Sequence, residues 1–170
     1  AEIVFTDCIV PKENLLGAEG KGFKIAMQTL DGGRIGIAAQ ALGIAEGAME
    51  ESINFAKTRE QFGRPIAKFQ AIAFMLAEMA TKLEAAKNLV YKTAWLIDNG
   101  QDASMAASMA KFYASEVCNE IAAKTVQIHG GYGFIKDYKI ERMFRDCRVF
   151  TIYEGTSQVQ QMVISGKLLK

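Results

Sequence analysis

The chain has 170 residues, half of them apolar, with only two prolines and a formal net charge of +1. This length suits one domain with a sizeable core, and the balanced charge gives no electrostatic case for binding nucleic acid or an acidic membrane surface. No apolar run reaches the length of a membrane span, no signal peptide is visible, and the abundance of Ala and Met favours helices over strands.

The N-terminal residues differ in pattern from the rest. β-Branched and aromatic residues at positions 2–10 predict one strand that ends at Pro11, and residues 14–21 predict a linker. Because a single strand cannot form a sheet, and because the sequence begins without Met, we expect the partner strands in a longer protein. The distant Cys8, Cys118 and Cys147 form no CxxC pair and are expected to be buried, reduced thiols of an intracellular protein.

Apolar residues recur at helical spacing through the rest of the chain. Three long helices are predicted, at about Gly22 to Thr58, from Pro65 to about Asp98, and from a cap at Asp102 or Ser104 to about Ile128. Two shorter helices are predicted at about Lys139 to Asp146 and from a cap at Thr156 or Ser157 to about Leu168. Short turns between long helices predict an all-α, up-down bundle of the four-helix type, with a short N-terminal strand or extended segment.

The first long helix has two unusual features. Its glycines at 32, 33, 36, 43 and 47 each cost about 1 kcal/mol relative to Ala, which favours close approach of a neighbouring helix, or of a ligand, as their use. Asp31 and Arg34 place opposite charges three residues apart, usually a modest surface pair, on a helix that is apolar nearly all round.

The stretch from Thr151 to Gln158 combines a carboxylate, a glycine and capping residues before the last helix. Gly155 allows a substrate to approach the backbone, and the first N–H groups of the following helix are unpaired donors. Glu154 is therefore a candidate catalytic base beside a ligand cradle. The alternative is a solvated loop residue next to an ordinary N-cap, because capping motifs are common.

Other candidate sites carry weaker signals. A di-metal bundle needs Glu-x-x-His pairs on facing helices, and the single histidine, His129, excludes them, so no metal site is expected. His129 is instead predicted to be a hydrogen-bonded turn residue, and the Gly-rich residues 130–133 lack the context of a phosphate-binding loop. Arg59, with Gln61 and Phe62, could hold a phosphate and stack on a ring, or could form an exposed turn between helices.

Taken together and in this order, six stretches resemble the C-terminal helical domain of the acyl-CoA dehydrogenase family, short-chain type. They are residues 30–35 (LDGGRI), 59–63 (REQFG), 69–72 (FQAI), 127–133 (QIHGGYG), 141–146 (ERMFRD) and 152–157 (IYEGTS). The resemblance covers the chain from about residue 20 to its end. It implies that residues 1–18 are the tail of a middle β-domain with its linker and that residues 19–170 are the helical bundle domain.

The resemblance also implies an activity, the FAD-dependent conversion of a short-chain acyl-CoA to a trans-2-enoyl-CoA. In that reaction Glu154 removes the α-proton, the β-hydride moves to the flavin, and the Glu154 backbone N–H helps to bind the thioester oxygen. Gly155 leaves room for the thioester. The resemblance also implies that the acyl-CoA channel is lined by Asp31, Gly32, Gly33 and Arg34. Implied contacts to FAD are Arg59, Gln61, Phe62, Gln70, Gln127, Ile128, His129, Gly130, Gly131, Thr156, Ser157 and Gln158, some of them to the flavin of a neighbouring subunit.

As implied partners, the family adds further copies of the chain, in a homotetramer or dimer, and electron-transfer flavoprotein. Its members are cytoplasmic in bacteria and lie in the mitochondrial matrix in eukaryotes. This chain alone is expected to be inactive, because the middle domain holds much of the flavin. The alternative is a non-catalytic helical oligomerisation module of the same ancestry, although the joint presence of Glu154, Arg59 and Asp31 argues against lost function.

Overall fold

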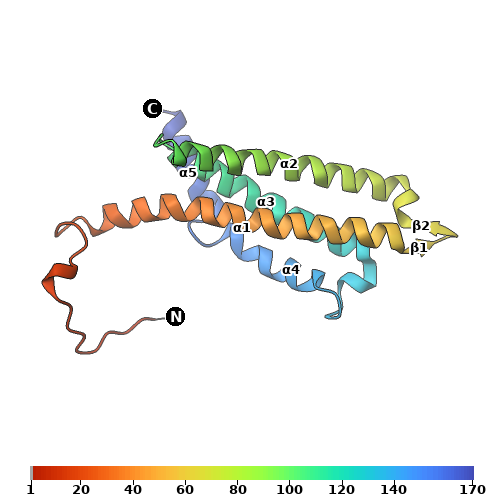
Figure 1. Ribbon diagram of the computed structural model, residues 1–170, viewed down its shortest axis with the longest axis horizontal. Helices are drawn as coiled ribbons and strands as arrows, with labels where there is room; N and C mark the ends of the chain where they lie inside the picture. Colours follow the sequence, from red (N-terminus) through yellow and green to blue (C-terminus); the bar gives the residue numbers. More distant parts are fainter. Residues whose placement is uncertain (1) are drawn as a thin grey trace.

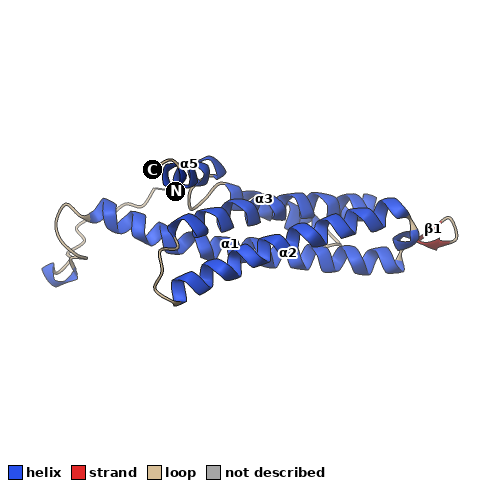
Figure 2. Ribbon diagram, turned by 90° about the horizontal axis from the view of Figure 1, so that it is seen from above, coloured by secondary structure: helices blue, strands red, loops and turns tan. Residues whose placement is uncertain are grey.

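A computed structural model describes residues 2–170 and shows an all-α bundle, which confirms the predicted fold class (Figure 1). Three long helices run side by side in alternating directions, as both views show (Figure 2). They are α1 (Gly22–Thr58), α2 (Gln70–Asp98) and α3 (Ser104–His129). The predicted ends of these helices agree with the structure within about two residues, except at the start of α2.

The connection between α1 and α2 is a small β-hairpin. Strands β1 (Glu60–Gln61) and β2 (Arg64–Pro65) pair antiparallel, and Phe62 and Gly63 between them have positive φ angles of 52° and 75°. Two consecutive left-handed residues are typical of a tight hairpin turn. The prediction that Pro65 begins the second helix was therefore wrong, because Pro65 pairs in the hairpin and a short 3-10 turn, η2 (Ile66–Lys68), precedes α2.

The N-terminal strand predicted at residues 2–10 does not form. Residues 2–11 are irregular and exposed, and the next regular element is a 3-10 turn, η1 (Lys12–Asn14). A strand requires a neighbour to share its backbone hydrogen bonds, and the described part of the chain offers none here. For the same reason the prediction that Cys8 is buried was wrong, whereas Cys118 and Cys147 are buried as predicted.

Small side chains hold the bundle together. Several alanines of α1 and α3 are almost completely buried and form the centre of the core with Ile121 and Met79. The contact between α1 and α3 is the most extensive in the bundle, and Ser52 donates a hydrogen bond to Thr125 across it at 2.9 Å. Because alanines allow two helices to approach closely, this seam fixes the position of α3 relative to α1.

Short elements complete the chain after α3. They are η3 (Gly130–Gly133), α4 (Ile140–Asp146), η4 (Cys147–Thr151) and α5 (Ser157–Leu168). The side-chain hydroxyl of Thr156 caps α5 by accepting a hydrogen bond from the Val159 N–H at 3.4 Å. Thr156 is one of the two residues predicted to cap this helix. Helix α5 lies at the end of the bundle opposite the hairpin (Figure 2). The turn that precedes it, at residues 152–156, lies beside α1 and α3 (Figure 1).

Candidate functional site

The turn before α5 holds its backbone in an unusual conformation. Glu154 and Gly155 have consecutive positive φ angles of 53° and 90°. A left-handed conformation costs a residue other than glycine of order 1–3 kcal/mol and persists only where its surroundings impose it. A Cβ atom at position 155 would lie 2.7 Å from Nε2 of Gln160, so glycine is also required there by the close contact.

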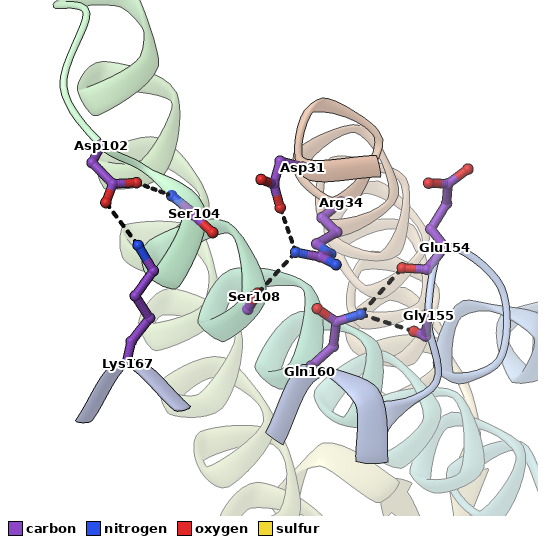
Figure 3. A network of polar contacts seen from close by, with 9 residues as sticks. All are labelled: Asp31, Arg34, Asp102, Ser104, Ser108, Glu154, Gly155, Gln160 and Lys167. Carbon is purple, nitrogen blue, oxygen red and sulfur yellow. Dashed lines mark hydrogen bonds and ion pairs between the residues drawn. The ribbon is translucent and has the colours of Figure 1, made fainter. Parts of the chain in front are cut away.

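Two buried side chains hold this turn by its carbonyl groups. Gln160 Nε2 donates to the carbonyl oxygens of Glu154 at 3.1 Å and Gly155 at 2.9 Å (Figure 3). Lys111 Nζ, from α3, donates to the Gly155 carbonyl at 2.6 Å. Both side chains are fully buried. The carbonyls of the turn therefore face the protein interior, while the backbone N–H of Glu154 donates to no acceptor among the described residues.

The carboxylate of Glu154 lies against α1. A Cβ atom added to Gly33 would come 2.9 Å from the carboxylate carbon, so the absence of a side chain at Gly33 makes room for Glu154. Glu154 is half-buried, and within residues 2–170 its carboxylate accepts no hydrogen bond. The side chain is therefore placed by packing and is not tied to a protein partner.

A buried cation lies on the same part of α1. Arg34 is 6% exposed, donates from Nη1 to Asp31 at 2.5 Å and to Ser108 at 3.4 Å, and has a buried Nε without a partner in the described chain (Figure 3). The pair thus joins a buried guanidinium to a carboxylate whose side chain is 41% exposed, so one partner lies in the interior and the other at the surface.

Asp31 and Gly32 also border a groove of about 400 Å³ between α1 and the turn from α2 to α3. In this groove Asp102 receives hydrogen bonds from Lys167 at 3.0 Å and from the Ser104 N–H at 3.0 Å, and these contacts hold the pKa of Asp102 below its usual range. These hydrogen bonds of Asp102 connect the start of α3 to the end of α5.

A second cavity, of about 440 Å³, lies at the hairpin end of the bundle. Phe55 stacks on His129 with ring centroids 4.2 Å apart, and the Arg59 guanidinium lies 5.3 Å from the centroid of Tyr132. The cavity is lined by Phe55, Arg59, Gln61, Ile66, Ile128, His129, Gly130, Gly131, Tyr132 and Ile135. A cation, aromatic rings and glycine backbone at one opening suit a phosphate joined to a planar ring.

The end of α3 shapes this cavity. His129, the last residue of α3, is buried, and its Nδ1 lies 2.8 Å from the Thr125 carbonyl, so Nδ1 carries the proton and donates it. Gly130 follows with φ 58° and ψ −133°, a conformation open essentially to glycine alone. His129 is thus a hydrogen-bonded residue at a helix end, in agreement with the prediction.

The predicted cofactor residues fall into separate groups. Arg59, Gln61 and residues 128–131 line the hairpin cavity. Phe62 does not line it, because it lies 92% exposed at the tip of the hairpin, where its ring packs edge to face with Phe69. Three other predicted cofactor residues are exposed and do not line this cavity, namely Gln70, Gln127 and Gln158. The hydroxyl of Ser157 is buried and donates to Glu116 at 2.6 Å, so it is directed into the protein.

Sequence reasoning missed several residues of both sites. Lys111 and Gln160 were not singled out, nor were the cavity residues Phe55, Ile66, Tyr132 and Ile135. One signal was readable for Lys111, because it falls on the same helical face as the buried Ala107 and Ala114. A lysine on a buried helical face is rare unless it is paired.

The two sites lie far apart in one copy of the chain. Gly33 and the end of α1 at Thr58 are 25 residues apart in a single helix, and a rise of 1.5 Å per residue separates them by roughly 38 Å. One dinucleotide cannot reach both positions. A dinucleotide that contacts both groups of residues must therefore take each group from a different copy of the chain.

Within residues 2–170, no cluster of three His, Cys, Asp or Glu side chains could hold a metal ion. Among the helices described, none is both long and apolar enough to cross a membrane.

Comparisons with known proteins agree with one another. A family model described as "Acyl-CoA dehydrogenase, C-terminal domain" matches residues 20–169. The caffeyl-CoA reductase-Etf complex subunit CarC of Acetobacterium woodii is 69% identical over 170 residues, 100% of this chain and 45% of that protein. The short-chain specific acyl-CoA dehydrogenase of Clostridium acetobutylicum is 56% identical over 169 residues, 99% of this chain and 45% of that protein.

The structure of butyryl-CoA dehydrogenase from Megasphaera elsdenii matches with a TM-score of 0.97 at 53% identity, covering 98% of this chain and 44% of that one. The chain therefore spans less than half the length of the relatives it matches.

Proposed function

The chain belongs to the acyl-CoA dehydrogenase family, whose C-terminal domain it matches, and on this premise we propose that it supplies the catalytic base of a flavoenzyme. The enzyme oxidises the Cα–Cβ bond of an acyl-CoA thioester to a trans-2-enoyl-CoA. Glu154 takes the α-proton, and FAD, when bound, accepts the hydride from the β-carbon. The observation that carries the proposal is the Glu154 carboxylate, half-buried, without a protein partner, and packed against a glycine.

The chemistry explains why the turn is built in this way. Loss of the α-proton places negative charge on the thioester oxygen, which must be stabilised by hydrogen-bond donors held in position. The backbone N–H of Glu154 has no acceptor within the described chain and is free to serve as such a donor. A carboxylate without a protein hydrogen bond is also free to accept the proton, and removal of water from the site increases its strength as a base.

Arg34 supplies the fixed positive charge of this site. Its side chain is buried, and hydrogen bonds from its Nη1 to Asp31 and Ser108 orient it. A buried cation near the reacting thioester would favour the developing enolate over the neutral substrate. Asp31, Gly32, Gly33 and Gly155 would then border the channel that receives the acyl-CoA.

The residues at the hairpin end fit part of FAD. The Arg59 guanidinium suits a pyrophosphate, the backbone at Gly130 and Gly131 permits close approach, and the stacked Phe55 and His129 provide an apolar wall. Because this cavity lies far from Glu154, it would hold the flavin of a second copy, with Gln61, Gln70 and residues 127–128 close by. Thr156, Ser157 and Gln158 would lie beside the flavin that works with Glu154.

Assembly and electron transfer follow from this arrangement. A flavin shared between copies requires at least a dimer, and a tetramer built from two such dimers is proposed. A relative named as part of a complex with Etf supports electron-transfer flavoprotein as the redox partner. The proposed location is the cytoplasm of a bacterium, or the mitochondrial matrix in a eukaryote.

The acyl group has two candidates. Relatives named short-chain specific acyl-CoA dehydrogenase and butyryl-CoA dehydrogenase support a short aliphatic chain. The 69% identical relative is named for caffeyl-CoA, which supports a 3-arylpropanoyl group and its 2-enoyl counterpart. Comparing kcat/KM for butyryl-CoA and for 3-phenylpropanoyl-CoA in the flavin-containing enzyme decides between them.

The test of the function is Glu154→Gln in the flavin-containing enzyme. Glutamine keeps the shape of the side chain but cannot take the proton, so the variant should keep its flavin absorbance and lose bleaching by acyl-CoA. Glu50→Gln, at an exposed position of α1, is the matched control and should bleach like the wild type. Normal bleaching of Glu154→Gln would remove Glu154 from the role of base.

A further inference from the structure

Lys111 is a charged residue in the core of the bundle. It lies on the face of α3 that packs into the interior, between the buried Ala110 and Ala114, and its side chain is fully buried. Within residues 2–170 its ammonium makes one hydrogen bond, at 2.6 Å to the Gly155 carbonyl. The lysine thus reaches from the N-terminal part of α3 to the turn that carries Glu154.

A buried ammonium is an expensive way to stabilise a fold. Moving a charge out of water costs several kcal/mol, and an apolar side chain of similar volume is often neutral or stabilising in its place. Burial accordingly lowers the pKa of Lys111, and the nearby Arg34 lowers it further, while Glu116 and Glu154 oppose the decrease. Packing alone therefore gives no reason for a cation at this position.

The turn gives such a reason. Gln160 already donates to both carbonyls of the turn, so Lys111 adds a second, charged donor to Gly155. A charge-assisted hydrogen bond is roughly twice as strong as a neutral one. Bonds of this strength can hold Glu154 and Gly155 in their consecutive left-handed conformations, which a free loop would leave.

We propose that Lys111 is a positioning residue for the base. By holding the Gly155 carbonyl it keeps the Glu154 carboxylate against Gly33 and keeps the Glu154 N–H directed away from the interior. The proposal rests on the proposed function, since it concerns the geometry of that base. Lys111 does not touch the substrate, and its effect is transmitted through the backbone of the turn.

The charge of Lys111 has a second consequence. The charged groups that face it are Arg34 from α1, Glu116 from α3 itself and Glu154 from the turn. Because burial lowers the pKa of Lys111, the ammonium should lose its proton at the alkaline end of the pH profile of kcat/KM. The rate should then fall in that alkaline limb, and a variant without a titrating group at position 111 should lack the limb.

The experiment compares Lys111→Met, Lys111→Gln and Lys111→Arg in the flavin-containing enzyme, with Lys92→Met on the exposed face of α2 as the control. Methionine fills the same space without a donor, so flavin reduction should slow by about 10- to 100-fold, the loss expected for a displaced catalytic group. KM should stay within about twofold, because substrate contacts are intact. Arginine restores donor and charge and should recover most of the rate.

Lys111→Gln separates geometry from charge. It can still donate to the Gly155 carbonyl but carries no charge, so it should lose less rate than Lys111→Met, and both variants should lack the alkaline limb of the pH profile. Should the methionine variant fail to retain flavin, the glutamine and arginine variants still give this comparison.

Three outcomes would overturn the proposal. They are a wild-type rate in Lys111→Met, an equal loss of rate in the arginine variant, and a decrease in Tm without any change in the pH profile. The Glu154→Gln variant measured alongside keeps the two hypotheses apart. An inactive Glu154→Gln with a fully active Lys111→Met contradicts the positioning role alone, whereas an active Glu154→Gln contradicts the proposed function itself.

Discussion

At the scale of single residues, the site depends on where side chains are absent as much as on where they are present. Gly33 makes room for the Glu154 carboxylate, and Gly155 makes room for Gln160. Both glycines lie opposite polar side chains and not at a helix–helix contact. The sequence left close approach of a helix or of a ligand open for the glycines of the first helix, and at Gly33 the close neighbour is the side chain of Glu154.

Two glycines of α1 give a matched pair of variants. A Cβ atom at Gly36 meets nothing within 4 Å, so Gly36→Ala should stabilise the protein by about 0.5–1 kcal/mol through helix propensity and leave the rate unchanged. Gly33→Ala gains the same propensity but displaces the flexible end of Glu154, and flavin reduction should slow by about tenfold. Urea denaturation and stopped-flow reduction measure the two effects. Equal rates in both variants would show that Gly33 does not define the position of the base.

The three cysteines should differ in reactivity. Cys8 is exposed, whereas Cys118 and Cys147 are buried next to one another. The hydrogen bond with Cys147, together with burial, raises the pKa of Cys118, and the same bond lowers the pKa of Cys147. Iodoacetamide at pH 8 should modify Cys8 within minutes and the other two only after unfolding, as mass spectrometry of tryptic peptides would show. Rapid labelling of Cys147 in the folded protein would contradict its burial.

At the scale of elements, α2 and α3 are joined on their outer side by a network of ion pairs. Lys82 contacts Glu120 at 2.6 Å and Glu78 at 2.9 Å, and Lys124 contacts the same two carboxylates, each at 2.7 Å. Four alternating charges in mutual contact favour one orientation of the two helices. The network is partly exposed, so salt should weaken it.

This network predicts a dependence of stability on pH. Hydrogen bonds from Lys124 and Lys82 lower the pKa of Glu78 from 4.5 to about 2. A carboxyl group whose pKa is lower in the folded state stabilises the protein above its unfolded pKa, and this contribution is lost as pH falls from 4.5 toward 2. The free energy of unfolding should therefore fall less steeply in this range for Glu78→Gln than for the wild type.

Urea unfolding between pH 5 and pH 2 would measure that difference, with Glu50→Gln as an exposed control on α1. Repeating the series in about 1 M NaCl should reduce the difference, because the Debye length is then only about 3 Å. Identical slopes for the wild type and Glu78→Gln would mean that the network adds nothing to stability.

At the scale of the whole molecule, the bundle separates its two sites. The Glu154 turn lies toward the α5 end and the Arg59 cavity at the hairpin end, with most of α1 between them (Figure 1). A rigid helix cannot bring them together within one copy. Flavin binding and assembly are therefore expected to be coupled.

Arg59→Met tests this coupling. Removing the cation from the hairpin cavity should weaken flavin retention by about tenfold or more, which is the loss expected for a charged hydrogen bond. Flavin retention should also depend more strongly on enzyme concentration. Arg64→Met is the matched control, because Arg64 lies on the same hairpin but stacks on Phe69 at 4.4 Å outside the cavity. Sedimentation velocity followed at the flavin absorbance measures both quantities. Flavin retained equally by both variants at every concentration would assign the cavity another role.

The helices were predictable from the sequence because their signals are local. The long apolar stripes, the Asn99-Gly100 stop and the Thr156 cap predicted the five α-helices, with ends correct to about two residues except at the start of α2. Two local predictions failed where the outcome depends on a partner. Residues 2–10 have strand-forming composition but no neighbouring strand in the described part of the chain, and Pro65 has a typical place at a helix start but pairs in a hairpin instead.

The candidate site divides in the same way. The residue types of Glu154, Gly155, Arg34 and Arg59 in their motifs indicated the family, and the residues alone left open whether each was functional or an ordinary surface or turn residue. Lys111 and Gln160 carry no motif of their own. Lys111 is 44 positions and Gln160 is 5 positions away from Gly155 in the sequence. Only tertiary packing brings Lys111 within reach of the turn.

The sequence by itself determined the helical class of the chain and the order of its helices, because apolar periodicity, caps and turn residues act over a few neighbouring positions. It also named Glu154 as a candidate base, through the family resemblance of its motif. Only the tertiary structure decided that Gly33 lies under that carboxylate, that a buried lysine holds its turn, and that the second cavity lies at the far end of α1. These facts depend on contacts between residues distant in the chain, which form when the alanine seam brings α1 and α3 together.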